Sequence, residues 1–184
     1  PDTTVDEIMG VMPGPDFPTG GIICGLKGIK EAYHTGRGKL RVRGVFHIEE
    51  MKGDRSKVVL DELPYAVNKA MLIMKIADLV NNKVMTGVSD IRDESDRQGL
   101  RVVLDLKRGE IPDVIVNQLY KFTDFQVTFG CNMLALDNGL PRVMNVKHMI
   151  TCWIDHRTEV VRRRTRFELK KAESRAHLLE GYLK

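Results

Sequence analysis

Hydrophobic and polar residues alternate along three segments of the chain, and this alternation predicts β-strands with one buried face. The clearest case spans residues 39–49, where one face carries Leu40, Val42, Phe46 and Ile48 and the other carries Lys39, Arg41, Arg43, His47 and Glu49. Residues 57–64 predict a second strand, which ends at Pro64 and pairs with the first as an antiparallel hairpin. Residues 100–108 predict a third strand with one solvated face.

Helical spacing of apolar residues predicts three helices among these strands. A helix over 26–33 follows a short apolar strand and is closed by Gly36. A second helix covers 68–82 with Asn68 as its N-cap, and a third covers 112–120. One-sided strands followed by helices favour an α+β fold with an antiparallel sheet and helices in two layers. A parallel Rossmann sheet is disfavoured, because its strands would be apolar on both faces.

The two ends of the chain depart from this pattern. Residues 1–19, which we call the N-terminal lead, are rich in proline and glycine, so we expect an extended, turn-rich segment. Residues 145–184 contain no proline and one glycine, so we expect a helix of about 60 Å that projects from the body. Its narrow apolar stripe is typical of a coiled-coil seam that lacks its partner. The stripe consists of Ile150, Ile154, Thr158, Val161, Thr165, Leu169, Ala172, Ala176, Leu179 and Leu183.

The composition, 42% hydrophobic and 29% charged, is typical of a soluble globular protein. No segment approaches the roughly 18 consecutive apolar residues of a membrane span, so we expect no membrane partner. The chain opens on Pro1 instead of Met and carries no secretory signal, which favours an internal piece of a longer cytoplasmic protein. Cys24, Cys131 and Cys152 are far apart and form no CxxC pair, so we expect neither a disulfide framework nor a zinc site.

The net charge of +4 is unevenly placed along the chain. Residues 142–184 hold eleven basic and five acidic residues, whereas the remainder is slightly acidic. The C-terminal segment is therefore a candidate contact for a polyanion. Its arginine-rich stretch, VVRRRTRFELKK, has two interpretations: a solvated coiled-coil flank with Glu–Lys partners, or a phosphate contact.

Two short motifs suggest ligand chemistry but are better explained as turns. GRGK at 36–39 resembles part of a phosphate loop, yet the GxxxxGK[ST] pattern is absent. RDESD at 92–96 clusters carboxylates that could hold Mg²⁺ or Ca²⁺, yet the spacing of a calcium loop is absent. The five histidines form no HExxH pattern, and no GxSxG serine accompanies them. We therefore expect no catalytic residue and no metal site in this chain.

Basic residues recur at every second position of the first predicted strand. Lys39, Arg41 and Arg43 thus share one face about 7 Å apart, near the spacing of successive phosphates along one DNA strand. Lys107 and Arg108 end a neighbouring predicted strand. We expect these five residues to contact DNA phosphates independently of sequence, and an ordinary solvated sheet face is the alternative.

Eight sequence blocks occur together, and in the same order, in one known family: PGPDFPTGG, EAYHTGRGK, ELPYAVNKA, IADLV, RDESD, LYKFTDFQVTFGCNMLAL, HRTEVVRRRT and RAHLLEG. On these blocks the whole chain resembles the gyrase A / topoisomerase IV A family of bacterial type IIA DNA topoisomerases, and it is more similar to gyrase. The resemblance implies a leading segment (1–14), a tower-like α+β domain (15–140) and the first arm of a long coiled coil (141–184). That arm would lead to the C-gate dimer interface, with its returning helix beyond Lys184.

The resemblance also implies a parent enzyme that supercoils DNA by ATP-dependent double-strand passage. It would contain two A and two B subunits, act on double-stranded DNA near the nucleoid, and use Mg²⁺ and ATP through the B subunit. The family's nucleophile is a tyrosine preceded by arginine. Tyr33, Tyr65, Tyr120 and Tyr182 instead follow Ala, Pro, Leu and Gly. The chain alone is therefore expected to cleave no DNA.

The family's tower supports the arms of the bent gate DNA, and bending a site of 20–30 base pairs costs about 1–6 kcal/mol. The expected role of the chain is to contact and support this DNA and to link the DNA gate to the C-gate. One alternative is a purely structural spacer without direct DNA contact. Another is an independent enzyme for a nucleotide or carboxylate substrate, which would need a nucleophile–base pair that the sequence lacks.

Overall fold

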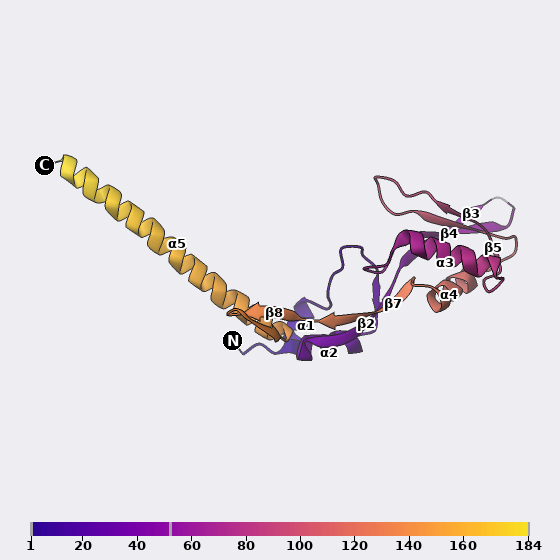
Figure 1. Cartoon of the computed structure of the whole chain (residues 1–184), viewed down its shortest axis with the longest axis horizontal. Coiled ribbons are helices and arrows are strands. Elements are labelled where there is room, and N and C mark those ends of the chain that lie inside the picture. Colours follow the sequence, from indigo (N-terminus) through magenta and orange to yellow (C-terminus); the bar gives the residue numbers. More distant parts are fainter. Residues whose placement is uncertain (1, 52, 184) are drawn as a thin grey trace.

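Two antiparallel sheets form the body of the protein, and one long helix leaves it (Figure 1). The computed structural model describes residues 2–51 and 53–183, so Pro1 and Lys184, the outer ends of the expected leading segment and helix, lie outside it. Along the chain the elements are α1 (Val5–Val11), β1 (Ile22–Cys24), α2 (Lys27–Thr35), β2 (Arg37–Arg43), β3 (Val45–Met51), β4 (Arg55–Glu62), α3 (Lys69–Asn81), β5 (Val88–Asp93), β6 (Val102–Leu106), α4 (Pro112–Phe122), β7 (Gln126–Asn132), β8 (Leu134–Asp137), β9 (Leu140–Val143) and α5 (Val146–Tyr182). The predicted α+β class is confirmed.

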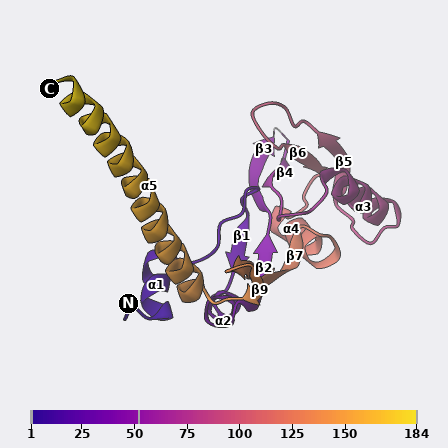
Figure 2. The same cartoon turned by 60° about the vertical axis from the view of Figure 1, so that its left-hand side comes forward.

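The larger sheet has the strand order β3-β4-β6-β5, and all neighbouring strands are antiparallel. Helices α3 and α4 pack on one of its faces, which gives the predicted two layers (Figure 2). Ile76, Leu119 and Leu60 are fully buried between them. Asn68 accepts a hydrogen bond from the Met71 N–H (3.1 Å), which confirms the predicted start of α3.

The other face of this sheet is only partly solvated, contrary to the prediction for β6. Val59 and Val103 lie opposite each other in adjacent strands and are fully buried. Arg92 and Arg101 belong to an ion-pair network on this side, in which Arg101 Nη2 lies 2.8 Å from a Glu49 carboxylate oxygen. Long basic side chains can cover apolar residues with their stems while the charged heads stay in water. We attribute the burial of both valines to this arrangement.

The smaller sheet has the order β1-β2-β7, and α2 covers one of its faces. Leu40 and Val42 of β2 pack there with Ile29 and Tyr33 of α2. Val146, at the start of α5, completes this second core. The predicted short strand and first helix are thereby confirmed. The sequence pattern predicts neither β5 and β7 nor the separate hairpin formed by β8 and β9.

The alternating segment 39–49 is not one strand, so that prediction is wrong. It divides at Gly44 into β2 and β3, which belong to different sheets. The Gly44 N–H donates to the Phe125 carbonyl (2.8 Å), and a Cβ at Gly44 would overlap the Phe125 ring. The apolar residues of the segment keep the same parity on both sides of the break, although Ile48 of β3 is exposed. Alternation alone therefore does not reveal it.

The N-terminal lead is less extended than expected, because α1 forms within it. Thr4 and Glu7 build a capping box at its start: Thr4 Oγ1 accepts from the Glu7 N–H (3.2 Å), and Glu7 accepts from the Thr4 N–H (2.7 Å). Each contact satisfies a backbone donor that the first helical turn leaves without an internal partner. The proline-rich residues 13–19 contain no helix or strand, as predicted.

Helix α5 has 37 residues and is therefore about 55 Å long. Asn145 caps it by accepting a hydrogen bond from the His148 N–H (2.8 Å). The helix projects from the body, which confirms the predicted long helix (Figures 1 and 2). Apolar residues along it, such as Val161 and Leu179, are exposed. Within the described part of the chain, every helix is too short or too polar to span a lipid bilayer.

Candidate nucleic-acid interface

The basic residues predicted at every second position lie on the outward face of β2. Side chains of a strand point alternately to its two faces. Because Leu40 and Val42 are buried against α2, Lys39 and Arg41 point the other way and are exposed. The structure thus confirms that these two side chains share a solvated face.

The surroundings of this face favour an anionic ligand. Strands β1, β2 and β7 together contain four basic residues and no Asp or Glu. Opposite Lys39 and Arg41, β7 places Gly130 and Thr128, which are small and leave both basic side chains accessible. In the part of the chain that the structure describes, neither Lys39 nor Arg41 forms an ion pair.

Arg37 extends this arrangement and was missed by the sequence prediction. It begins β2, is exposed, and lies two residues before Lys39, so it shares the same face. Extending the two-residue period by one step would have found it. We call Arg37, Lys39 and Arg41 the basic row.

Arg43, the third residue of the predicted triplet, is held against the body. Its Nε donates to Gln126 Oε1 (2.7 Å), and its guanidinium carbon lies 4.5 Å from the centre of the Tyr120 ring. Tyr120 in turn stacks on Phe125 and donates a hydrogen bond to the Gly44 carbonyl (3.3 Å). Burial raises the pKa of Tyr120, so the phenol beside this cation stays uncharged. Arg43 is therefore anchored at the junction between the two sheets.

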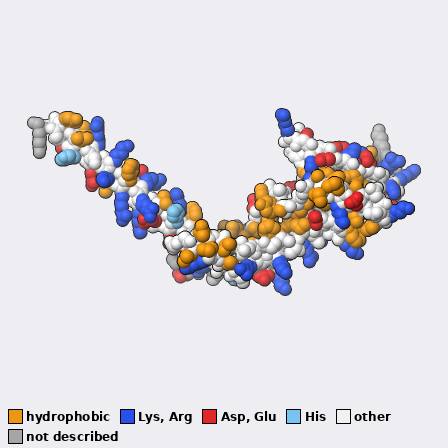
Figure 3. Space-filling model, viewed as in Figure 1, with side chains coloured by type: hydrophobic (Ala, Val, Ile, Leu, Met, Phe, Trp, Pro, Cys, Tyr) orange, Lys and Arg blue, Asp and Glu red, His pale blue; other side chains and the backbone are white. Residues whose placement is uncertain are grey.

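Lys107 and Arg108 lie at the far end of the larger sheet. They follow β6 in an exposed turn, where the Lys107 N–H donates to the Gly87 carbonyl (2.7 Å). The seven residues of β3, roughly 20 Å of strand, separate this end from the junction with β2. The structure thus does not bring these two residues together with the basic row. Figure 3 shows Lys and Arg side chains at this end of the molecule and along α5.

The turn interpretation of the two short motifs holds only in part, because residues 37–39 of GRGK begin β2 and residues 92–93 of RDESD end β5. Gly36 of GRGK adopts a left-handed conformation (φ 79°) and ends α2. In RDESD, Asp93 forms an ion pair with Lys69 (2.6 Å), which lowers the pKa of Asp93 to about 2. The Ser95 N–H donates to Asp93 Oδ1 (3.1 Å), as in a local turn.

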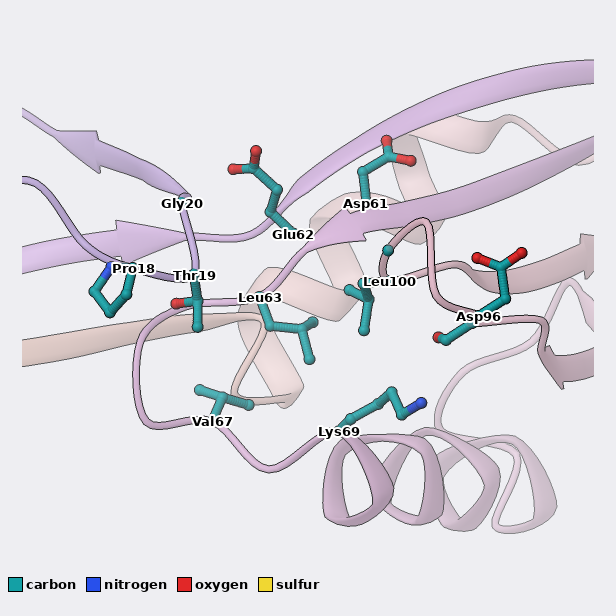
Figure 4. A pocket seen from close by; sticks show the side chains of 12 residues that line it. Pro18, Thr19, Gly20, Asp61, Glu62, Leu63, Val67, Lys69, Asp96 and Leu100 are labelled. Carbon is teal, nitrogen blue, oxygen red and sulfur yellow. The ribbon is translucent and has the colours of Figure 1, made fainter.

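A hollow of about 650 Å³ opens where the N-terminal lead meets the larger sheet (Figure 4). Its lining carries Asp61, Glu62 and Asp96, with Lys69 as the basic residue. Glu62 Oε2 accepts a hydrogen bond from the Gly21 N–H (2.6 Å), which ties the lead to the end of β4. The excess of carboxylates repels phosphate groups. The hollow therefore disfavours the alternative of an enzyme for nucleotides.

Comparison with known proteins decides the family. A family model for the A subunit of DNA gyrase/topoisomerase IV matches residues 2–184. The chain belongs to the family of DNA gyrase/topoisomerase IV A subunits. The DNA gyrase A subunit of Chlamydia muridarum is 62% identical over 185 residues, which are 100% of this chain and 22% of that protein.

More distant members of the family of DNA gyrase/topoisomerase IV A subunits match over the same range. The DNA gyrase A subunit of Pseudomonas aeruginosa is 53% identical, covering 98% of this chain and 20% of that protein. The chloroplastic/mitochondrial DNA gyrase A subunit of Nicotiana benthamiana is 50% identical, covering 100% of this chain and 20% of that protein. The chain thus spans about a fifth of the length of the curated relatives that it matches.

Three of the four tyrosines of this member of the gyrase/topoisomerase IV family pack against the body, whereas Tyr182 is exposed on α5. Tyr33 is 4% exposed, and burial raises its pKa. Tyr65 stacks on Phe17 with ring centres 5.7 Å apart. Tyr120 anchors Arg43, as described above. No tyrosine in the sequence follows an arginine, so the arginine–tyrosine pair that the resemblance implies for the family's nucleophile does not occur in this chain.

Proposed function

We propose that this chain is part of the A subunit of an ATP-dependent, gyrase-like type II DNA topoisomerase, where it contacts and supports the bent gate DNA. Family membership supports the parent enzyme. The observation that carries the DNA contact is the exposed basic row on a sheet whose strands contain no acidic residue.

The spacing of the basic row suits a phosphate backbone. Alternate residues of a strand lie about 7 Å apart, and neutralising each phosphate of duplex DNA releases counterions. Such contacts are independent of base sequence and help to offset a bending cost of about 1–6 kcal/mol. Lys107 and Arg108, at the far end of the larger sheet, would meet a different part of the duplex. Arg43 would fix the orientation of β2 through its contacts with Gln126 and Tyr120.

In the parent enzyme we place residues 15–140 in the tower, residues 1–14 in a leading segment and residues 141–184 in the first coiled-coil arm. The exposed apolar side chains of α5 support this division, because a narrow stripe on a long helix needs a partner helix to cover it. The arm would link the DNA gate to the C-gate.

The proposal further assigns the chain to an assembly of two A and two B subunits, in the cytoplasm beside the nucleoid. Mg²⁺ and ATP would act through the B subunit. This chain, which lacks an arginine–tyrosine pair, would cleave no DNA on its own.

A charge-reversal experiment tests the DNA contact. Fluorescence anisotropy with a labelled duplex would compare the wild type with a Lys39→Glu/Arg41→Glu double variant across a salt titration. Each phosphate contact contributes about 0.9 to the log–log salt slope, so we expect the slope to become shallower by roughly 2. Affinity at low salt should fall together with the slope.

A matched control separates the face of β2 from net charge. Lys27→Glu/Lys30→Glu changes the net charge equally, but these exposed residues lie on α2, which covers the opposite face. Equal weakening by both double variants would show that only net charge matters. Unchanged binding by the β2 variant would leave the chain as a structural spacer. The same comparison in the full-length protein, paired with its B subunit, extends the test to the whole enzyme.

A further inference from the structure

We propose that the base of α5 holds a site for a divalent cation of the zinc class, built from Asp137, His148 and Cys152. Each residue offers one ligand atom, and the three atoms lie within 4.8 Å of one another. Asp137 comes from the end of β8, whereas His148 and Cys152 come from the first two turns of α5. The inference does not depend on DNA contact.

The geometry is close to that of a tetrahedral metal site. Zinc–ligand bonds of about 2.0–2.3 Å place the ligand atoms of such a site about 3.3–3.8 Å apart. Asp137 Oδ2 and His148 Nε2 are already 3.9 Å apart. His148 and Cys152 are four residues apart, so they share one face of the helix. Side-chain rotation that moves the ligand atoms by about 1 Å would complete the arrangement.

The surrounding residues orient the carboxylate toward the helix. Asn138 Nδ2 donates to Asp137 Oδ1 (3.0 Å), and Oδ2 faces His148. Hydrogen bonds of this kind fix the orientation of metal-binding carboxylates in many proteins. Asp137 and Cys152 line a hollow of about 430 Å³ together with His156, which lies one helical turn beyond Cys152 and is the candidate for a fourth ligand.

The mixture of donors indicates the class of cation. A carboxylate oxygen, an imidazole nitrogen and a thiolate sulfur together suit Zn²⁺, whereas Mg²⁺ and Ca²⁺ prefer oxygen ligands throughout. The competing arrangement is an ordinary surface ion pair, since Arg142 Nη1 also lies 3.4 Å from Asp137 Oδ2. Surface ion pairs contribute little to stability. A bound cation would instead tie the β8–β9 hairpin to the start of α5.

Cobalt provides a spectroscopic probe for the site. We expect the metal-depleted chain to bind one Co²⁺ with the visible absorption of a tetrahedral complex and a thiolate-to-cobalt charge-transfer band, and Zn²⁺ to displace it. Cys152→Ser should abolish the charge-transfer band, whereas Cys24→Ser, a control outside the site, should keep it. Calorimetric titration with Zn²⁺ should show affinity falling more than about tenfold in Asp137→Asn and in His148→Gln, because even outer-shell changes commonly cost about 10–100-fold.

Three results would overturn the proposal. The first is the absence of saturable Co²⁺ uptake by the wild-type chain. The second is a charge-transfer band that survives in Cys152→Ser. The third is Zn²⁺ affinity unchanged in Asp137→Asn and His148→Gln. His148 is exposed and the other two ligands are half-buried, and an unchanged circular dichroism spectrum of each variant would show that the fold is intact.

Discussion

Replacing Gly44 with alanine should destabilise the body, because the junction between the sheets has no room for a methyl group. A Cβ there would overlap the Phe125 ring and lie 2.6 Å from the Glu62 carbonyl oxygen. Phe125 is fully buried and stacks on Tyr120 with ring centres 5.2 Å apart. The ring therefore cannot withdraw without opening the core of the larger sheet.

The loss of stability in Gly44→Ala can be estimated from the two groups that the new methyl group would meet, the Phe125 ring and the Glu62 carbonyl. Overpacking a core costs about 1–3 kcal/mol, and we expect about 2–3 kcal/mol here, because a buried ring and a backbone carbonyl both block the methyl group. For a chain of this length, 1 kcal/mol shifts Tm by about 2–4 °C, so Tm should fall by roughly 4–12 °C. Urea and thermal unfolding followed by circular dichroism measure both quantities.

Gly130→Ala provides the matched control in the same sheet. No atom lies within 4 Å of a Cβ at Gly130, in the middle of β7. Alanine is favoured over glycine within a strand by about 0.5–1 kcal/mol, so this variant should be as stable as the wild type or slightly more stable. A Gly44→Ala protein within about 0.5 kcal/mol of the wild type would refute the close packing of Phe125 on Gly44.

The ion pairs of the larger sheet lead to two pH predictions. Hydrogen bonds that the His47 ring donates to Asp61 (2.7 Å) and then to Glu49 (3.2 Å) raise the pKa of His47 above its ordinary value of 6.5. The stability that these hydrogen bonds contribute is full below pH 6.5 and is lost as the pH rises through the raised pKa. The free energy of unfolding of His47→Gln, measured in urea, should lack this pH dependence. Identical pH profiles of the wild type and the variant would contradict the prediction. Lys69 lowers the pKa of Asp93 from 3.8 to about 2, so the stability from this pair is present above pH 3.8 and lost as the pH falls toward 2. In Lys69→Met, the Asp93 midpoint in a carboxyl NMR titration should rise toward 3.8, and an unmoved midpoint would show that Lys69 is not the cause.

Local signals in the sequence predicted the elements that depend on local contacts. The caps of α3 and α5 are Asn68 and Asn145, whose side chains bond to backbone N–H groups three residues away. The same kind of signal precedes α1, where Thr4 and Glu7 have the spacing of a capping box, and the proline-rich residues begin only after this helix has ended.

Features that depend on residues far apart in the sequence could not be predicted in this way. The break at Gly44 is imposed by Phe125, and the anchoring of Arg43 by Gln126 and Tyr120. The exposure of Lys39 followed from alternation alone, whereas the distance of Lys107 from it follows from the order of strands in two sheets. His148 and Cys152 had the spacing of helical metal ligands, but Asp137 approaches them only through the β8–β9 hairpin.

The base of helix α5 is packed against the inner face of the smaller sheet, while the rest of the helix projects from it. Val146 is buried beside Leu40 and Val42, and the Met144 N–H donates to the Met133 carbonyl (3.0 Å) just before the helix begins. Over a length of about 55 Å, a tilt of about 5° at this packed base would displace the far end of the helix by about 5 Å. Strand β2 carries the basic row on its outer face and packs against the base of α5 on its inner face. A ligand that binds the outer face and rotates β2 slightly would therefore also rotate the base of α5, and the length of the helix would turn that rotation into a larger displacement of its far end.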